Sequence, residues 1–295
     1  MKVSIDARQR LDAVGRSTPE WRPWLGLVEE TLVALGDPAW ERVEVRGDPH
    51  PPDGAPALAG AEIVVDRRVV RAWVRRLLRA ASGGGASGAV SLRGAAHRLD
   101  PRRFLEVAVG HDLEALAALS ADSGADREAL TALLAVAPMP VLHALGRRLA
   151  ERVPESWSHG YCPVCGGWPT LAEVRGLERA VRLRCARCGG DWRGEWLQCC
   201  FCGKADHRQL GGLMSESHGE TRKVETCESC RGYLKTMTTL AAWPAQTVAL
   251  EDLATVDLDV AALGRGYRRP EKPGYPLGVR LVETASKRGF FRRRR

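Results

Sequence analysis

The chain lacks the segments that direct proteins to membranes or to the secretory route. Residues 1–14 mix charged side chains every few positions and contain no apolar stretch of signal-peptide length. The most apolar window, 130–145, is too short to span a bilayer and is interrupted by Pro138 and Pro140. We therefore expect a cytoplasmic protein with no membrane span.

Lysine and recognisable catalytic patterns are also scarce. Only six of the 44 basic side chains are Lys, so the net charge of +8 comes mainly from Arg. A basic balance alone argues only weakly for a nucleic-acid partner. The seven His are scattered, and neither a Ser-His-Asp pattern nor a phosphate-binding glycine loop is evident. These features favour a binding protein over an enzyme.

Cysteine is absent from three quarters of the chain and concentrated in the rest. All nine cysteines lie between positions 162 and 230, and eight of them form C-x-x-C pairs. The pairs are Cys162/Cys165, Cys185/Cys188, Cys199/Cys202 and Cys227/Cys230. In a cytosolic protein this spacing indicates metal binding rather than disulfides.

Two metal sites follow from the number of pairs. A C-x-x-C turn supplies two thiolates, and a closed tetrahedral site needs four. The intervals between pairs are 19, 10 and 24 residues, which favours sequential pairing. The first predicted site then uses Cys162, Cys165, Cys185 and Cys188, and the second uses Cys199, Cys202, Cys227 and Cys230. An interleaved cross-brace of the same eight residues is the alternative.

The turn geometry favours glycine with positive φ directly after the second Cys of a pair. Gly166, Gly189 and Gly203 stand there, whereas in the fourth pair Gly232 comes one residue later. Thiolate ligands do not distinguish zinc from a single iron ion.

Other residues near the pairs have simpler interpretations. We interpret Cys200 as a small buried apolar residue. His207 and His218 are expected in a loop, since four cysteines already fill the second site. Three arginines flank ligands and are placed to ease the charge of four thiolates around a divalent ion, namely Arg184, Arg187 and Arg231.

The remaining pattern predicts an α+β protein with a helical N-terminal bundle. Apolar periodicity predicts helices at 17–44 and 66–81 and three more between 100 and 153. The predicted units are an α-helical domain at 1–155, with flexible segments at 46–62 and 82–90, β modules at 156–195 and 196–240, a helix at 241–268 and a basic tail at 269–295.

The motifs together resemble the FdhE family of formate dehydrogenase accessory proteins. They are CPVCGGWP at 162–169, RLRCARCGGDW at 182–192, CCFC at 199–202, VETCESCRGYLK at 224–235 and DLATVDLDVAALGRGY at 252–267. Trp192, Tyr233 and Lys235 match positions of that family. The resemblance covers about 160–268 and implies two rubredoxin-like modules, iron at the tetracysteine sites, a cytoplasmic location and binding to the catalytic subunit of formate dehydrogenase.

Two other functions compete with this interpretation. Arg292–Arg295, together with Trp192 and Trp196 beside ligands, suits a zinc-ribbon protein that binds nucleic acid. Iron at either site suits a rubredoxin-like electron carrier. The sequence leaves the oligomeric state open.

Overall fold

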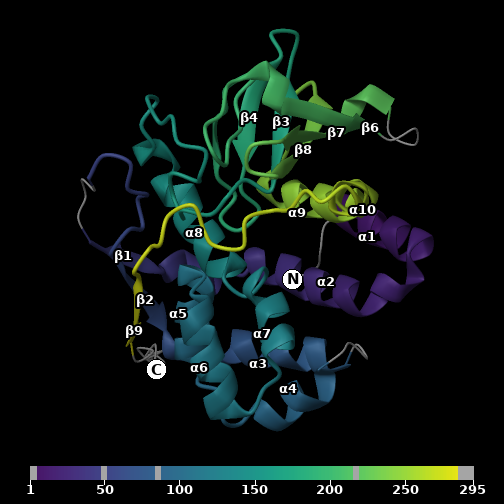
Figure 1. Cartoon of the computed structure of the whole chain (residues 1–295). Coiled ribbons are helices and arrows are strands. Elements are labelled where there is room, and N and C mark those ends of the chain that lie inside the picture. The colour runs from purple at the N-terminus through teal and green to yellow at the C-terminus, as the bar shows by residue number, and fades with distance from the viewer. Residues whose placement is uncertain (1–4, 48–51, 84–87, 215–218, 285–295) are drawn as a thin grey trace, which may run out of the picture.

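A computed structural model describes residues 5–47, 52–83, 88–214 and 219–284. A layer of N-terminal helices lies below a six-stranded sheet, and two C-terminal helices lie between them (Figure 1). This arrangement confirms the predicted α+β class.

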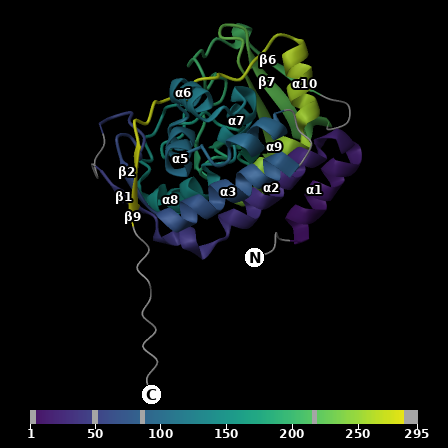
Figure 2. The same cartoon turned by 90° about the horizontal axis from the view of Figure 1, so that it is seen from below.

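The N-terminal layer contains eight α-helices among the described residues. They are α1 (Ile5–Ser17), α2 (Arg22–Leu35), α3 (Arg67–Gly83), α4 (Ala89–Ala95), α5 (Pro101–Gly110), α6 (Leu113–Ser123), α7 (Arg127–Leu134) and α8 (Met139–Leu149). In α3 the apolar stripe is buried as its periodicity predicts, with Val70, Trp73 and Leu77 at most 3% exposed. Seen from below, α2 and α3 run side by side across the molecule (Figure 2).

Residues 101–149 form four helices, one more than the periodicity predicts. The additional break is at His111, whose φ of 52° is left-handed and ends α5. The carboxylate of Asp112 then accepts hydrogen bonds from the N–H groups of Glu114 and Ala115 and caps α6. The sequence hides this break because His, unlike Gly, does not announce a left-handed residue.

A small sheet of order β1-β2-β9 joins distant parts of the chain. Its strands are β1 (Glu44–Arg46), β2 (Glu62–Asp66) and β9 (Arg280–Thr284). β9, within the segment expected as a tail, pairs in parallel with β2 and buries Leu281. Part of the segment expected to be flexible, 52–61, also packs, and Leu58 is fully buried. Positions 48–51, 84–87 and 285–295 of the expected flexible segments and tail lie outside the described residues.

The six-stranded sheet has the order β5-β4-β3-β8-β7-β6. Its strands are β3 (Leu171–Arg175), β4 (Ala180–Arg184), β5 (Asp191–Arg193), β6 (Leu210–Met214), β7 (Arg222–Cys227) and β8 (Tyr233–Thr239). The segments 156–195 and 196–240 are called the two cysteine-rich segments. Each supplies three consecutive antiparallel strands. The parallel pair β3–β8 joins the two halves into one sheet.

Two C-terminal helices, α9 (Ala245–Ala254) and α10 (Val256–Gly264), follow the sheet where one helix was expected. Helix α9 lies against α1, and α10 lies against β6 and β7. The main hydrophobic core runs from the helical layer into the first cysteine-rich segment and includes Cys162, Cys165, Cys185 and Cys188.

Candidate metal centres

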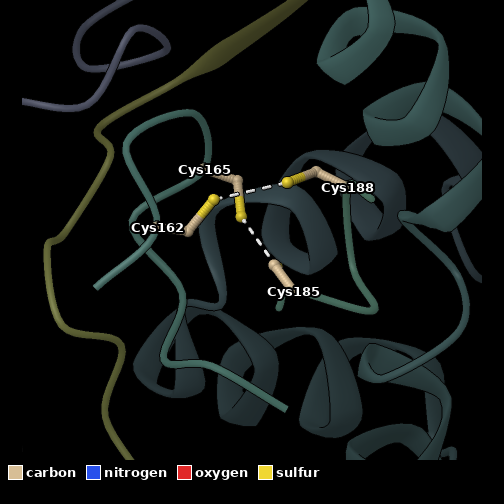
Figure 3. Close-up of side chains that lie close together, drawn as sticks. All are labelled: Cys162, Cys165, Cys185 and Cys188. Atoms are coloured by element: carbon tan, nitrogen blue, oxygen red, sulfur yellow. Dashed lines mark hydrogen bonds between the residues drawn. The ribbon is translucent and has the colours of Figure 1, made fainter. Parts of the chain in front are cut away.

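Four thiols from the first two C-x-x-C pairs converge on one point (Figure 3). The sulfur of Cys162 lies 3.4 Å from that of Cys188, and the sulfur of Cys165 lies 3.6 Å from that of Cys185. A tetrahedral ion with metal–sulfur bonds of about 2.3 Å separates its ligands by about 3.8 Å. This group, called the first centre, therefore has a spacing suited to one tetrahedral metal ion.

The other two pairs form a second centre of the same kind. Its sulfurs come from Cys199, Cys202, Cys227 and Cys230 and lie within 4.8 Å of one another. The distances from Cys199 to Cys230 and from Cys202 to Cys227 are both 3.7 Å. The second centre thus has the same ligand set and spacing.

All four pairs lie on turns with closely similar backbone conformations. In the first turn, the N–H of Gly166 donates to the carbonyl of Cys162 at 2.9 Å, and the N–H of Cys162 donates to the carbonyl of Gly167. The residue after the second cysteine is left-handed each time, with φ of 64° at Gly166, 77° at Gly189, 73° at Gly203 and 56° at Arg231. Glycine stands there in three turns as expected. In the fourth the position belongs to Arg231, and not to Gly232.

The first centre is enclosed by protein. Its four cysteines are 0–2% exposed. Burial raises the pKa of Cys162, and the hydrogen bond with Cys162 raises that of Cys188, both well above the ordinary thiol value. Four ionised thiols at this position therefore require a cation among them.

The second centre reaches the surface. Cys202 and Cys230 are exposed, whereas Cys227 is buried. Beside it a cleft of about 620 Å³ separates the two cysteine-rich segments, and Cys199, Cys202 and Cys227 contribute to its walls. The second centre is therefore less enclosed by protein than the first.

The structure brings the cysteines together in the sequential pairing, and not in the interleaved alternative. Cys200 belongs to neither group, and it is half-buried against the core where a buried residue was expected. Burial of its thiol raises the pKa well above the ordinary value. His207 lies in a short 3-10 helix before β6 and belongs to neither group. His218 lies outside the described residues. Metal ligation by the eight cysteines stays a prediction.

The three flanking arginines have different partners. Arg184 is 3% exposed and pairs with the buried carboxylate of Glu173, so it serves the sheet interior. Arg187 donates to the carbonyl of Ala108 at 2.7 Å. The pKa of Cys165 is lowered first by its hydrogen bond with Cys162 and further by the charge of Arg187. Arg187 thus lies where its charge acts on a thiol of the first centre. Arg231 pairs with Glu228 and lies over a Tyr ring at 4.1 Å.

A buried ionic cluster explains the Tyr-x-Lys motif after the fourth pair. Lys235 is fully buried, and its ammonium lies 2.7 Å from the carboxylates of both Asp252 and Asp259. Arg269 pairs with the same two carboxylates, and the hydroxyl of Tyr233 donates to Asp259 at 2.8 Å. The sequence singles out Tyr233 and Lys235 but does not show that Asp252 and Asp259 are their partners. Asp252 and Asp259 stand seven residues apart on the α9–α10 segment, and this helical spacing is the sequence feature that places two carboxylates on one face.

The two tryptophans beside the ligands differ in exposure. Trp192 is 1% exposed and donates from its indole nitrogen to the carbonyl of His159, so its ring cannot stack on a base. Trp196 is 46% exposed, and Arg179 lies over its ring at 5.7 Å. The aromatic part of the nucleic-acid hypothesis therefore loses one of its two residues.

The apolar window at 130–145 was expected to be too short for a membrane span, but the longer segment 127–152, which includes α7 and α8, has the length and composition of one. However, 78% of the most apolar window is buried inside the protein. Burial to this extent is also found in core helices of proteins that cross no membrane.

Comparison with known proteins places the second centre in a described domain. A sequence profile of the FdhE C-terminal domain matches residues 197–273. This range holds all four cysteines of the second centre together with α9, α10 and the buried ionic cluster. The match therefore covers the second centre and the helices and ionic cluster that follow it in the chain.

Curated relatives share sequence similarity with about two fifths of the chain. A Protein FdhE homolog of Aquifex aeolicus is 32% identical over 121 residues, which is 40% of this chain and 42% of that protein. A Protein FdhE homolog of Pseudomonas aeruginosa is 34% identical over 125 residues, or 40% of each chain. The alignments therefore span about two fifths of these relatives.

A solved structure covers nearly the whole fold. The crystal structure of the FdhE protein from Pseudomonas aeruginosa aligns with 92% of this chain and 94% of that one, with a TM-score of 0.58 and 25% identity. The similarity thus includes the helical layer, in which the sequence showed no motif.

Proposed function

We propose that the chain, which is similar to FdhE proteins in sequence and in fold, is an accessory protein needed for active formate dehydrogenase and that it binds the catalytic subunit of that enzyme. The observation that supports this proposal most strongly is that a fold similar to that of an FdhE protein holds two four-cysteine groups beside one sheet. The proposal includes a cytoplasmic location.

The eight grouped cysteines are proposed to hold two mononuclear metal ions. Each ion, zinc or iron, would cross-link two turns and would stabilise the fold. The chain's own contribution is the left-handed residue in every turn, which aims both sulfurs of a pair at one point.

The proposed action is binding rather than catalysis. Among the described residues, the most buried carboxylates are engaged with cations of the same chain: Glu173 pairs with Arg184, and Glu251 pairs with Arg222. Ionisable groups held in this way stabilise the fold and are not available for proton transfer to a substrate.

Co-purification tests the proposed partner. A tagged catalytic subunit of formate dehydrogenase from the same cell should retain the full-length chain, and deletion of the gene for the chain should lower formate dehydrogenase activity in extracts. A subunit that retains none of the chain, together with undiminished activity in the deletion strain, contradicts the proposal.

An electron carrier is the second candidate function, because Cys202 and Cys230 are exposed and would give a short path for electron transfer if iron is bound. Elemental analysis with an optical spectrum decides between the metals. Iron with a colour that dithionite bleaches supports this function. Stoichiometric zinc without visible absorbance excludes it.

A further inference from the structure

The second turn of the first centre, at Cys185 and Cys188, is contacted by helix α8 of the helical layer. A Cβ atom built on Gly146 of α8 would lie 2.2 Å from the carbonyl oxygen of Cys188, so this helix touches the turn with no space for a methyl group. One helical turn earlier, the imidazole Nε2 of His143 lies 2.8 Å from the carbonyl oxygen of Ala186. Helix α8 is therefore seated directly on the second turn.

The first turn of this centre is held by two other segments. The N–H groups of Ala57 and Leu58 donate to the carbonyls of Pro163 and Val164 at 2.8 and 3.2 Å. From the C-terminal side, the N–H of Tyr275 donates to the carbonyl of Gly166 at 3.0 Å. Loss of a metal ion from this centre would thus loosen the turns that contact α8, residues 57–58 and Tyr275.

The sulfurs of the first centre are also packed too closely for an incoming ligand. A Cβ built on Gly190 would lie 2.9 Å from the sulfur of Cys162 and 3.2 Å from that of Cys188. A cavity of about 600 Å³ lined by Gly146, Cys188 and Gly190 borders this centre. Its cysteines are nevertheless at most 2% exposed, so a chelator or thiol reagent reaches these sulfurs only after the core opens locally.

The second centre differs from the first in the exposure of its cysteines. Two of its four cysteines, Cys202 and Cys230, are exposed, and the cleft of about 620 Å³ passes beside it. Its turns contact the C-terminal segment, where the N–H of Arg268 donates to the carbonyl of Arg231 at 2.8 Å. Helices α1–α8 contribute no residue to the cleft wall.

We propose that the two centres have different roles: the first is a clamp that fixes the helical layer to the sheet, and the second exchanges its metal with ligands in solution through the cleft. The proposal rests on metal binding by both groups of cysteines. Exchange here means replacement of thiolates by the donor atoms of another ligand, with no change in the oxidation state of sulfur or metal.

The test starts from the full chain loaded with two zinc ions. Excess EDTA should remove one ion about tenfold faster than the other or more, because release from the first centre requires local opening of the core. N-ethylmaleimide added after the fast phase should label Cys199, Cys202, Cys227 and Cys230. The other four grouped cysteines should stay unlabelled, and amide hydrogens of α8 should keep their protection from exchange.

A pair of glycine variants tests the clamp without altering a ligand. Gly146→Ala should speed the slow release of zinc and leave the fast release unchanged, since the new methyl group displaces α8 from Cys188. Gly26→Ala is the matched control, because its Cβ on α2 meets no atom within 4 Å. This control should release both ions as the unchanged chain does.

Three results would overturn the proposal: equal release of the two ions, earlier labelling of the first centre, or an unchanged slow phase in a folded Gly146→Ala variant. Should Gly146→Ala not fold, the release and labelling of the unchanged chain still decide the question. A protein that takes up no metal at all would instead contradict the metal binding proposed above.

Discussion

Arg231 shows most clearly what a single residue contributes to these turns. Its φ of 56° is the left-handed conformation that glycine provides in the other three turns. The side chain compensates for this conformation, because its guanidinium pairs with Glu228, donates to the carbonyl of Arg265 at 2.7 Å and lies over the ring of Tyr267. Glycine at three turns was predictable from spacing. The left-handed conformation of Arg231 in the fourth turn was not predictable, since the contacts of its side chain come from a segment some 35 residues away.

Two substitutions separate the backbone and side-chain effects at this position. Arg231→Ala removes the contacts and keeps a residue with a Cβ at positive φ, whereas Arg231→Gly removes the contacts and relieves the strain. We expect Arg231→Ala to lower the free energy of unfolding by about 1 kcal/mol more than Arg231→Gly. Denaturant unfolding of the metal-loaded variants measures this difference, and equal stability would show that the turn carries no such strain.

The ligand assignment is tested by two cysteine variants. Cys227→Ser should retain one metal ion per chain, because it removes a ligand of the second centre. Cys200→Ser is the control and should retain both ions, since Cys200 belongs to neither group. Elemental analysis of the purified proteins gives the ratio. Loss of metal from Cys200→Ser would refute the assignment.

At the scale of elements, helices were easier to predict than strand partners. The apolar stripe of α3 is a local pattern, and it locates the helix to within two residues at either end. The pairing of β3 with β8 depends on residues about 60 positions apart, and no local pattern encodes it. For the same reason the sequence predicted two modules without showing that they share one sheet.

The buried ionic cluster should anchor α9 and α10 to β8. Lys235→Met leaves Asp252 and Asp259 with Arg269 as their remaining cation. We expect a loss of about 3 to 5 kcal/mol in the free energy of unfolding, because an uncompensated charge stays buried. Chemical denaturation followed by tryptophan fluorescence measures it.

Lys223→Met is the matched control on the neighbouring strand. Lys223 is partly exposed and pairs with Glu225 on the surface, so its loss should change stability by no more than about 0.5 kcal/mol. Both variants should still bind two metal ions. Similar losses in the two variants would mean that burial of Lys235 has no special energetic role.

For the whole molecule, the small sheet ties the last described residues to the helical layer. Leu281 of β9 is 2% exposed, and its N–H donates to the carboxylate of Glu106 on α5 at 2.7 Å. A chain shortened to end at Gly278 loses these contacts. We expect it to lose about 2 to 4 kcal/mol of stability.

A chain shortened to end at Thr284 keeps β9 and serves as the control. Thermal unfolding of the two shortened chains should therefore give a lower midpoint only for the shorter one. Hydrogen exchange in β2 should rise in that chain alone. Equal midpoints would show that β9 is dispensable.

The β2–β9 pair also constrains when the protein can finish folding during its synthesis. β2 leaves the ribosome more than 200 residues before β9, so its parallel partner does not yet exist while the helices form. The first centre is complete in sequence once Cys188 has emerged, about 90 residues earlier than β9. If the first centre binds metal as proposed, the order of translation lets it take up its ion before β9 pairs with β2.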